Sequence, residues 1–290
     1  MEPHIELLRP LNSAMSAVAA AVGALVASGP DLFSSPHRLG VATAMLVAFL
    51  YTGAGNALND YYDRFTDRIN HPERPIPGKR IHPESARKFS VALFTAGMML
   101  ALLMGWPGIN WLTITIAALN GLLLAAYEVL LKVRGFVGNL TVGWLTASLF
   151  LFGGAAAVPE PGPTVFPLPV LLLALLAFLS SVGREIIKGI EDVKGDHERR
   201  TVPRIVGVRT AGRIAGLWIG MAVVLSPLPV FPLAIFLPQY YLPMVLLSDT
   251  MFIYSVWVVF RRPGKASKAT KFAMLLALVA FLLGALTVRS

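Results

Sequence analysis

Long apolar runs, separated by short polar joints, occupy most of the chain. A helix that crosses a bilayer needs about 20 mostly apolar residues, and nine runs meet that requirement. Many of the joints contain Pro or Gly, residues that end helices and form turns. The pattern therefore predicts an all-α integral membrane protein with nine transmembrane helices, near residues 11–29, 38–60, 86–105, 109–131, 137–157, 166–188, 209–226, 240–260 and 268–288.

Composition supports this prediction and excludes several classes of protein. Of the 290 residues, 56% are hydrophobic and only 14% are charged, with a mean hydropathy of +0.67. A soluble domain would carry roughly 25% charged residues. The net charge of +9 could suggest nucleic acid, but nine spans exclude a soluble nucleic-acid binder. Because the chain has no cysteine, it has no disulfide and no zinc–thiolate site.

Basic residues gather in alternate joints. The loops after the second, fourth, sixth and eighth spans, with their helix edges, hold 22 of the 25 Lys and Arg residues. By the positive-inside rule these loops face the cytoplasm, and we expect the N-terminus outside, with Arg9, Arg38 and Arg289 on that opposite face. In the last of these loops, topology and attraction to anionic lipid account for Arg261, Arg262, Lys265, Lys268 and Lys271.

Two rows of polar residues stand at the ends of two of these spans. Asn56, Asp60, Asp63 and Asp67 are spaced 4, 3 and 4 apart at the end of the second span, which places them on one face of a helix. Carboxylates stacked in this way repel one another, and each costs about 2.5–3.5 kcal/mol at a bilayer centre. Such a row is expected to line a water-filled cavity and to hold cations.

The same spacing recurs at the end of the sixth span, in Glu185, Gly189, Asp192 and Asp196, each 129 residues after its counterpart. A basic, proline-containing segment follows each row. The two helices could therefore face each other across one cavity. Gly189 stands where the repeat would place a carboxylate.

Clustered oxygen ligands without Cys or His favour hard cations such as Mg²⁺ or Ca²⁺. Cations held by carboxylates and surrounded by Arg and Lys suit a diphosphate, because the metal bridges the carboxylates and the phosphates while basic side chains bind the remaining oxygens. A structural network of salt bridges is the alternative explanation of a single row. Two matched rows with basic loops make that alternative weaker.

At these rows the chain resembles the UbiA superfamily of intramembrane prenyltransferases. The segment Asn59–Asp67 matches its Asn-Asp-x-x-Asp-x-x-x-Asp motif, and Asp192–Asp196 matches its Asp-x-x-x-Asp motif. The superfamily has nine helices around a central cavity, with these motifs on helices 2 and 6, so the similarity covers essentially the whole chain. The segments 7–12, 67–77 and 184–192 resemble an archaeal branch, the digeranylgeranylglyceryl phosphate synthases.

The resemblance implies a single transmembrane prenyltransferase domain over residues 1–290, in the cell membrane, with cytoplasmic catalytic loops at about 61–88, 128–136 and 189–208. It implies Mg²⁺-dependent transfer of a geranylgeranyl group from geranylgeranyl diphosphate to geranylgeranylglyceryl phosphate. This reaction forms the second ether bond of archaeal membrane lipid and releases diphosphate. The expected partners are thus a prenyl diphosphate, a lipid-like acceptor and membrane lipid, whereas the oligomeric state stays open.

The resemblance also implies roles for individual residues. Two Mg²⁺ ions would be held by Asn56, Asp60, Asp63, Glu185, Asp192 and Asp196. The diphosphate would be bound by Asn12, Asn59, Arg64, Arg74, Lys132, Lys188 and Arg204. The catalytic residues would be Asp63, Asp67, Tyr127 and Lys132. The superfamily often places its Tyr and Lys four residues apart, whereas Tyr127 and Lys132 are five apart.

Two other functions fit part of the pattern. An enzyme of the same superfamily could use an aromatic acceptor, as in quinone biosynthesis. A phosphate-bearing acceptor needs additional cations, and Arg9, Arg64 and Arg204 could supply them or could be topological. A cation-coupled transporter also pairs acidic helices, but here the rows lie toward one membrane face and each leads into a basic loop.

Overall fold

The structure, a computed structural model, describes residues 2–29, 32, 38–103, 110–157, 166–195 and 200–288. Within these ranges nine helices are long and apolar enough to cross a membrane, and there is no strand. The all-α prediction and its nine spans are confirmed. The predicted ends near 105 and 109 lie outside the described residues. The spans are α2 (Pro10–Ser28), α3 (Arg38–Tyr62), α5 (Pro83–Leu103), α6 (Trp111–Ala126) with the π-helical turn η2 (Tyr127–Leu131), α7 (Phe136–Ala157), α8 (Leu168–Glu191), α10 (Val208–Leu225), α11 (Pro238–Val258) and α12 (Pro263–Ala285).

Prolines mark where four of these spans begin. Pro10, Pro83, Pro238 and Pro263 are the first residues of α2, α5, α11 and α12. The first amide of a helix has no intrahelical partner, and the fixed φ of proline already suits a helix. A proline at this position therefore sets the start of a helix at no cost in hydrogen bonding.

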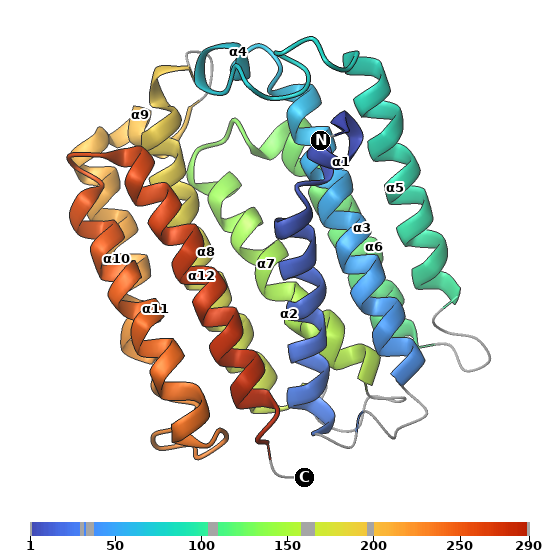
Figure 1. Cartoon of the computed structure of the whole chain (residues 1–290), viewed down its shortest axis with the longest axis vertical. Coiled ribbons are helices and arrows are strands. Elements are labelled where there is room, and N and C mark those ends of the chain that lie inside the picture. The colour runs from blue at the N-terminus through green and yellow to red at the C-terminus, as the bar shows by residue number, and fades with distance from the viewer. Residues whose placement is uncertain are drawn as a thin grey trace.

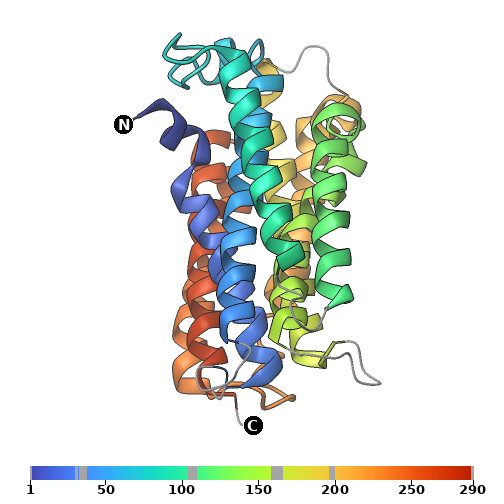
Figure 2. The same ribbon diagram turned by 90° about the vertical axis from the view of Figure 1, so that its right-hand side faces the viewer.

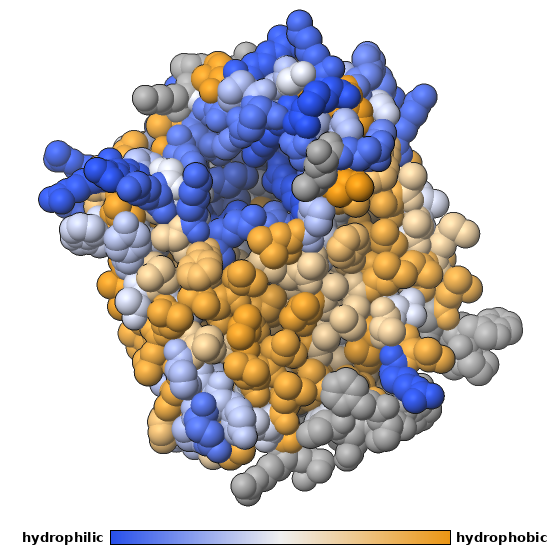
Figure 3. All heavy atoms as spheres, viewed as in Figure 1, coloured by the Kyte–Doolittle hydropathy of each residue, from blue (hydrophilic) through white to orange (hydrophobic). Residues whose placement is uncertain are grey.

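Four short helices lie together at one end of the bundle (Figure 1). They are α1 (Pro3–Leu8), α4 (Asp67–Asn70), the 3-10 turn η3 (Asp192–Lys194) and α9 (Val202–Val206). Figure 3 shows hydrophilic residues gathered at this end around a hollow, above a broad apolar surface. We call this the polar end. The apolar surface below it is what a helical bundle presents to lipid.

The N-terminal segment lies at the polar end, and the described chain ends at the opposite end (Figures 1 and 2). Arg80, in the loop after α3, forms an ion pair with Glu6 of α1 at 2.6 Å. The expectation that Arg9 and the N-terminus lie opposite the basic loops is therefore wrong. The reason is parity: the chain crosses twice between Arg9 and the loop after α3, and two crossings return it to the same face.

Helices α2 and α7 lie at the middle of the bundle, with α3, α5 and α6 to one side and α8 and α10–α12 to the other (Figure 1). Glycines let the two backbones approach closely. A Cβ atom on Gly23 would lie 2.1 Å from the carbonyl oxygen of Phe150, and one on Gly153 would lie 1.8 Å from that of Ala20. Only glycine fits at either position. This crossing, far from the polar end, fixes the two central helices together.

Candidate active site

The first polar row lies where α3 reaches the polar end. Although α3 ends at Tyr62, the Asp63 amide donates to the Asn59 carbonyl and the Asp67 amide to the Asp63 carbonyl, each at 2.8 Å. The row thus keeps its helical register through a turn into α4. Asp60, Asp63 and Asp67 are all buried. The predicted common helix face is retained, but Asp63 and Asp67 follow the end of α3 at Tyr62.

Two arginines neutralise the acids at either end of this cluster. Arg9 is hydrogen-bonded to Asp60 at 2.5 Å. Arg74 lies 2.7 Å from Asp67 and 3.4 Å from Asp60. Burial raises the pKa of Asp67 above its usual value, against the attraction of Arg74. Burial also opposes the charge of Arg74, but the nearby carboxylates of Asp60 and Asp67 raise its pKa above the usual value. Both arginines are thus charged and in direct contact with the cluster.

A π-helical turn places Lys132 beside Asp63, the remaining acid of the first row. The Lys132 amide donates to the Tyr127 carbonyl at 2.9 Å, five residues back. This turn absorbs the additional residue between them, and π-turns of this kind are frequent at functional sites. The Lys132 ammonium lies 2.6 Å from Asp63 and 3.0 Å from Glu128, and 5.8 Å from the centre of the Tyr127 ring. Glu128 in turn accepts a hydrogen bond from Asn59 at 3.0 Å.

The second row lies at the end of α8. Glu185 accepts a hydrogen bond from Arg184 at 2.5 Å. Asp192 in η3 lies 3.4 Å from His71, and its carbonyl accepts from the Asn70 side chain at 3.1 Å. Burial tends to raise the pKa of Asp192, but the His71 hydrogen bond and nearby positive charges hold it below the usual value. The same bond raises the pKa of His71. Helix α4 thereby connects the two rows.

Side chains from both rows meet in one small cavity at the polar end. Its free volume is about 60 Å³, and Gly189 lies in its wall. Six of the residues singled out from the sequence line it: Asp63, Tyr127, Lys132, Glu185, Lys188 and Asp192.

The remaining candidates lie around this cavity or away from it. Asn12 and Asn56 line larger cavities below it, and Asn56 donates to the Leu8 carbonyl at 3.0 Å. Arg64 stacks on Phe65 and lines an outer groove of the loop after α3. Arg204 is exposed on α9. Asp196 lies outside the described residues. The structure thus does not place Arg64 in these cavities.

The donor atoms of the first row fit a hard divalent cation. Asp60, Asp63 and Asp67 present buried carboxylate oxygens, and the Asn59 side-chain oxygen is buried without a hydrogen-bond partner. Such an unsatisfied oxygen is costly to bury and is the type of ligand that Mg²⁺ prefers. Among the described residues, no three acidic or histidine side chains are already close enough to hold a metal, because Arg9, Arg74 and Lys132 occupy these acids.

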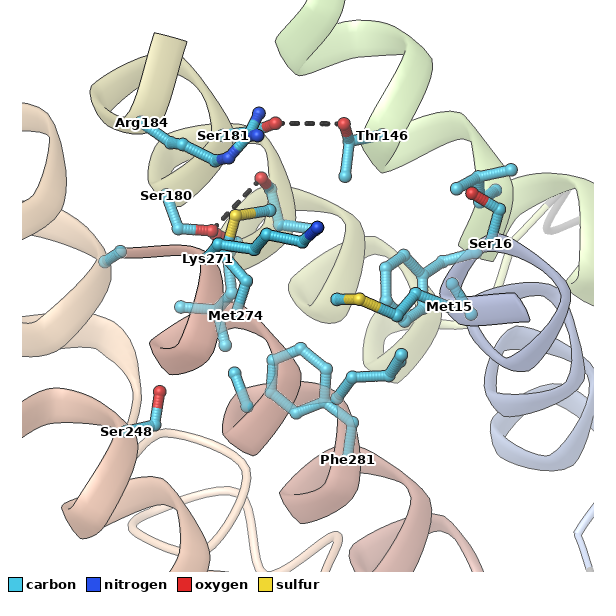
Figure 4. A pocket seen from close by; sticks show the side chains of 18 of the residues that line it. Met15, Ser16, Thr146, Ser180, Ser181, Arg184, Ser248, Lys271, Met274 and Phe281 are labelled. Atoms are coloured by element: carbon cyan, nitrogen blue, oxygen red, sulfur yellow. Dashed lines mark hydrogen bonds between the residues drawn. The ribbon is translucent and has the colours of Figure 1, made fainter. Parts of the chain in front are cut away.

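Two larger cavities extend from this region into the bundle. One, of about 230 Å³, lies among α2, α3, α6, α7 and α8, and we call it the α6 cavity. The other, of about 270 Å³, lies among α2, α7, α8, α11 and α12, and we call it the α12 cavity. The two cavities have several wall residues in common: Asn12, Ser16, Thr52, Asn56, Val142, Thr146, Leu149 and Arg184. Figure 4 shows the α12 cavity, with Lys271 extending into it from α12.

Sequence reasoning did not assign several polar residues of these cavities. Arg9 was placed on the wrong face, and Glu128 could have been found four residues before Lys132, one helical turn away. His71 has no ligand spacing in the sequence. Lys271, in the last basic loop, was attributed to topology, and Arg184, beside Glu185, was given no role of its own. Their helical register relative to the cavities was the missing information.

Comparison with known proteins agrees with this architecture. Residues 16–286 match the UbiA prenyltransferase family. The digeranylgeranylglyceryl phosphate synthase of Methanosarcina mazei is 41% identical over 97% of both chains. A solved structure of a digeranylgeranylglyceryl phosphate synthase in membranes is 33% identical, covers 98% of both chains and has a TM-score of 0.68.

A more distant solved structure, a UbiA homolog from Archaeoglobus fulgidus bound to geranyl diphosphate and Mg²⁺, is 13% identical with a TM-score of 0.64. It covers 95% of this chain and 99% of its own, and at this identity it supports the fold alone. The family match covers most of the chain. The nine apolar helices found among the described residues make the chain a multi-pass membrane protein. The chain therefore belongs to the UbiA prenyltransferase family and is a prenyltransferase.

Proposed function

We propose that this prenyltransferase uses Mg²⁺ to transfer a geranylgeranyl group from its diphosphate to geranylgeranylglyceryl phosphate, forming the second ether bond of an archaeal lipid. The observation that carries the proposal is the meeting of both acidic rows in one cavity, from which two largely apolar cavities extend. Two lipid-like substrates need such an arrangement. The near full-length similarity to a digeranylgeranylglyceryl phosphate synthase supports the choice of acceptor.

We assign one Mg²⁺ to Asn56, Asp60 and Asp63 and a second to Glu185, Asp192 and Asp196. When bound, these ions act as Lewis acids on the diphosphate oxygens and stabilise the leaving group. The structure supports this assignment through the buried oxygens of Asp60 and Asp63. Asn59, Asp67 and Arg204 belong to the surrounding shell of the diphosphate site in this proposal.

Basic side chains also stabilise the diphosphate leaving group. In the described structure Arg74 contacts Asp60 and Asp67, while Lys132 contacts Asp63. If Mg²⁺ were held by these carboxylates, Arg74 and Lys132 would be available to diphosphate oxygens, together with Lys188. Positive groups fixed in this way stabilise charge as it develops on the leaving group.

The bond changes take place where the α6 and α12 cavities share wall residues. The bond between carbon 1 of the prenyl group and its diphosphate oxygen breaks with both electrons on oxygen. The acceptor hydroxyl attacks carbon 1, a new ether bond forms, and its proton goes to Asp63, Asp67 or the diphosphate. Tyr127, at the wall of the α6 cavity, orients the diphosphate. The α6 cavity, which contacts the diphosphate residues Tyr127 and Lys188, holds the prenyl chain of the donor.

We also infer that the polar end faces the cytoplasm, because the basic loops lie there. On this orientation, residues 1–290 form one catalytic domain whose loops at about 61–88, 128–136 and 189–208 close the active site. The membrane involved is the cell membrane.

The decisive experiment is turnover by the purified protein in detergent with Mg²⁺, geranylgeranyl diphosphate and geranylgeranylglyceryl phosphate. We expect a diether product and released diphosphate, both abolished by EDTA. Product formed only with a hydroxybenzoate or naphthoate would instead make the enzyme an aromatic prenyltransferase. Ion flux across liposomes without any prenyl transfer would favour the transporter.

A further inference from the structure

We infer that the α12 cavity is the acceptor site and that Lys271, with Arg184 at its upper wall, binds the phosphate of the acceptor lipid. This inference rests on the proposed function and adds to it a residue that selects the acceptor.

Lys271 is placed in the membrane-spanning part of α12. It lies eight residues after the start of the helix at Pro263, which corresponds to a depth of about 12 Å at 1.5 Å per residue. Lys271 lines the α12 cavity, and Figure 4 shows its side chain extending into it. Lys268, one turn closer to the polar end, is exposed and does not line the cavity.

No counter-ion meets this lysine within the part of the chain that the structure describes. The charged side chains that act on it are cations, Arg184 and Arg9. Asp249 also lines the cavity, but its carboxylate accepts a hydrogen bond from Ser226 at 2.6 Å and forms no ion pair with Lys271. Ionisable side chains inside a membrane protein are costly and mark functional sites. Arg9 and Arg184 already pair with Asp60 and Glu185, so Lys271 is the member of this group of cations that has no anion among the described residues and is suited to bind one.

The cationic end of the α12 cavity is polar, and much of the remaining wall is apolar apart from Ser226, Ser248 and Asp249. Hydroxyl groups of Thr146 and Ser181, hydrogen-bonded at 2.9 Å, lie near Arg184. Phe281, ten residues beyond Lys271 on α12, lies about 15 Å deeper. The walls between are apolar, formed by Met15, Phe150, Met274, Leu278 and Phe281. A phosphate at the cationic end and a prenyl chain along the apolar walls match this distribution.

The diphosphate of the donor does not account for Lys271. Two of the cations assigned to the diphosphate, Arg74 and Lys132, do not line the α12 cavity, and Lys271 does not line the α6 cavity. Arg184 lines both. An acceptor whose phosphate lies between Lys271 and Arg184 would place its glycerol hydroxyl near the shared wall, close to the donor carbon. An aromatic acceptor without a phosphate would leave Lys271 unused.

The test is the substitution Lys271→Met, with Lys268→Met as the matched control on the exposed face of the same helix. A hydrogen bond to a charged group contributes enough that we expect the KM for geranylgeranylglyceryl phosphate to rise roughly 10- to 100-fold in Lys271→Met. The KM for geranylgeranyl diphosphate should not change. Lys271→Arg should recover most of the affinity, and Lys268→Met should behave as the wild type.

A binding measurement separates this inference from the proposed function. Thermal stabilisation of the detergent-solubilised protein by geranylgeranylglyceryl phosphate, without donor, should be lost in Lys271→Met, whereas geranylgeranylglycerol, which lacks the phosphate, should affect both proteins equally. If the wild-type protein binds the phosphate lipid through Lys271 but forms no ether, the binding site is supported and the proposed function is refuted. Equal binding and equal KM in wild type and Lys271→Met would overturn the site alone.

Discussion

The buried contacts of Lys132 allow a quantitative prediction for Lys132→Met. Its ammonium lies 2.6 Å from Asp63 and 3.0 Å from Glu128, and all three side chains are less than 10% exposed. Removing the ammonium takes the buried positive charge away from two carboxylates, and breaking a buried pair in this way costs about 3–5 kcal/mol. At roughly 2–4 °C of melting temperature per kcal/mol, the variant should melt at least about 6 °C below the wild type.

The control for this variant is Glu128→Gln, which keeps the ion pair between Lys132 and Asp63. Its amide oxygen can still accept from Asn59, so we expect a loss near 1 kcal/mol. The double variant leaves one carboxylate instead of two without the Lys132 charge and should be more stable than Lys132→Met alone. Melting would be followed by tryptophan fluorescence in detergent with EDTA, since a bound cation could replace the ammonium. A Lys132→Met protein that melts like the wild type would refute the network.

Three further predictions follow from features described above. Asp60→Asn or Asp192→Asn should abolish turnover while the protein still folds in detergent; near-normal product would refute the metal assignment. Because Asp192 raises the pKa of His71 above 6.5, the stability from this pair is complete below about pH 6.5 and is lost as pH rises through the raised value, while Asp192 remains ionised. In metal-free protein, His71→Gln should therefore destabilise more at pH 6 than at pH 8, and equal losses in a melting assay would contradict this. Gly153→Ala should lower stability by about 1–3 kcal/mol through overpacking, unlike Gly220→Ala, whose added Cβ meets no atom within 4 Å; equal melting of the two would exclude the close crossing.

The hydrophobic pattern was sufficient to predict the nine spans, because a bilayer imposes one length and one polarity on each of them. The two acidic rows were equally visible, since the regular spacing of 4, 3 and 4 fixes a common helix face. The π-turn at Tyr127 was not predictable. Sequence spacing alone does not show whether one additional residue moves Lys132 away or is absorbed by a wider turn.

Two other residues show where sequence reasoning ends. Arg9 could have been placed correctly by counting crossings from the basic loop. The position of Lys271 in the cavity could not have been predicted, because it is the last of five basic residues in a segment that has the pattern of a topology-determining loop. Its function depends on which face of α12 meets α8, and that is determined by packing between distant helices.

The close crossing of α2 and α7 has a consequence for motion. Glycine contacts at Gly23 and Gly153 lock the central helices at the end away from the loops, so substrate entry there would require breaking a tightly packed contact. At the polar end, ion pairs such as Arg9–Asp60 and Lys132–Asp63 hold the elements together, and a charged substrate would compete for these cations. The two central helices are thus held most tightly at the crossing of Gly23 and Gly153, away from the polar end. Any opening that admits two lipids should be largest at the loops and smallest at Gly153.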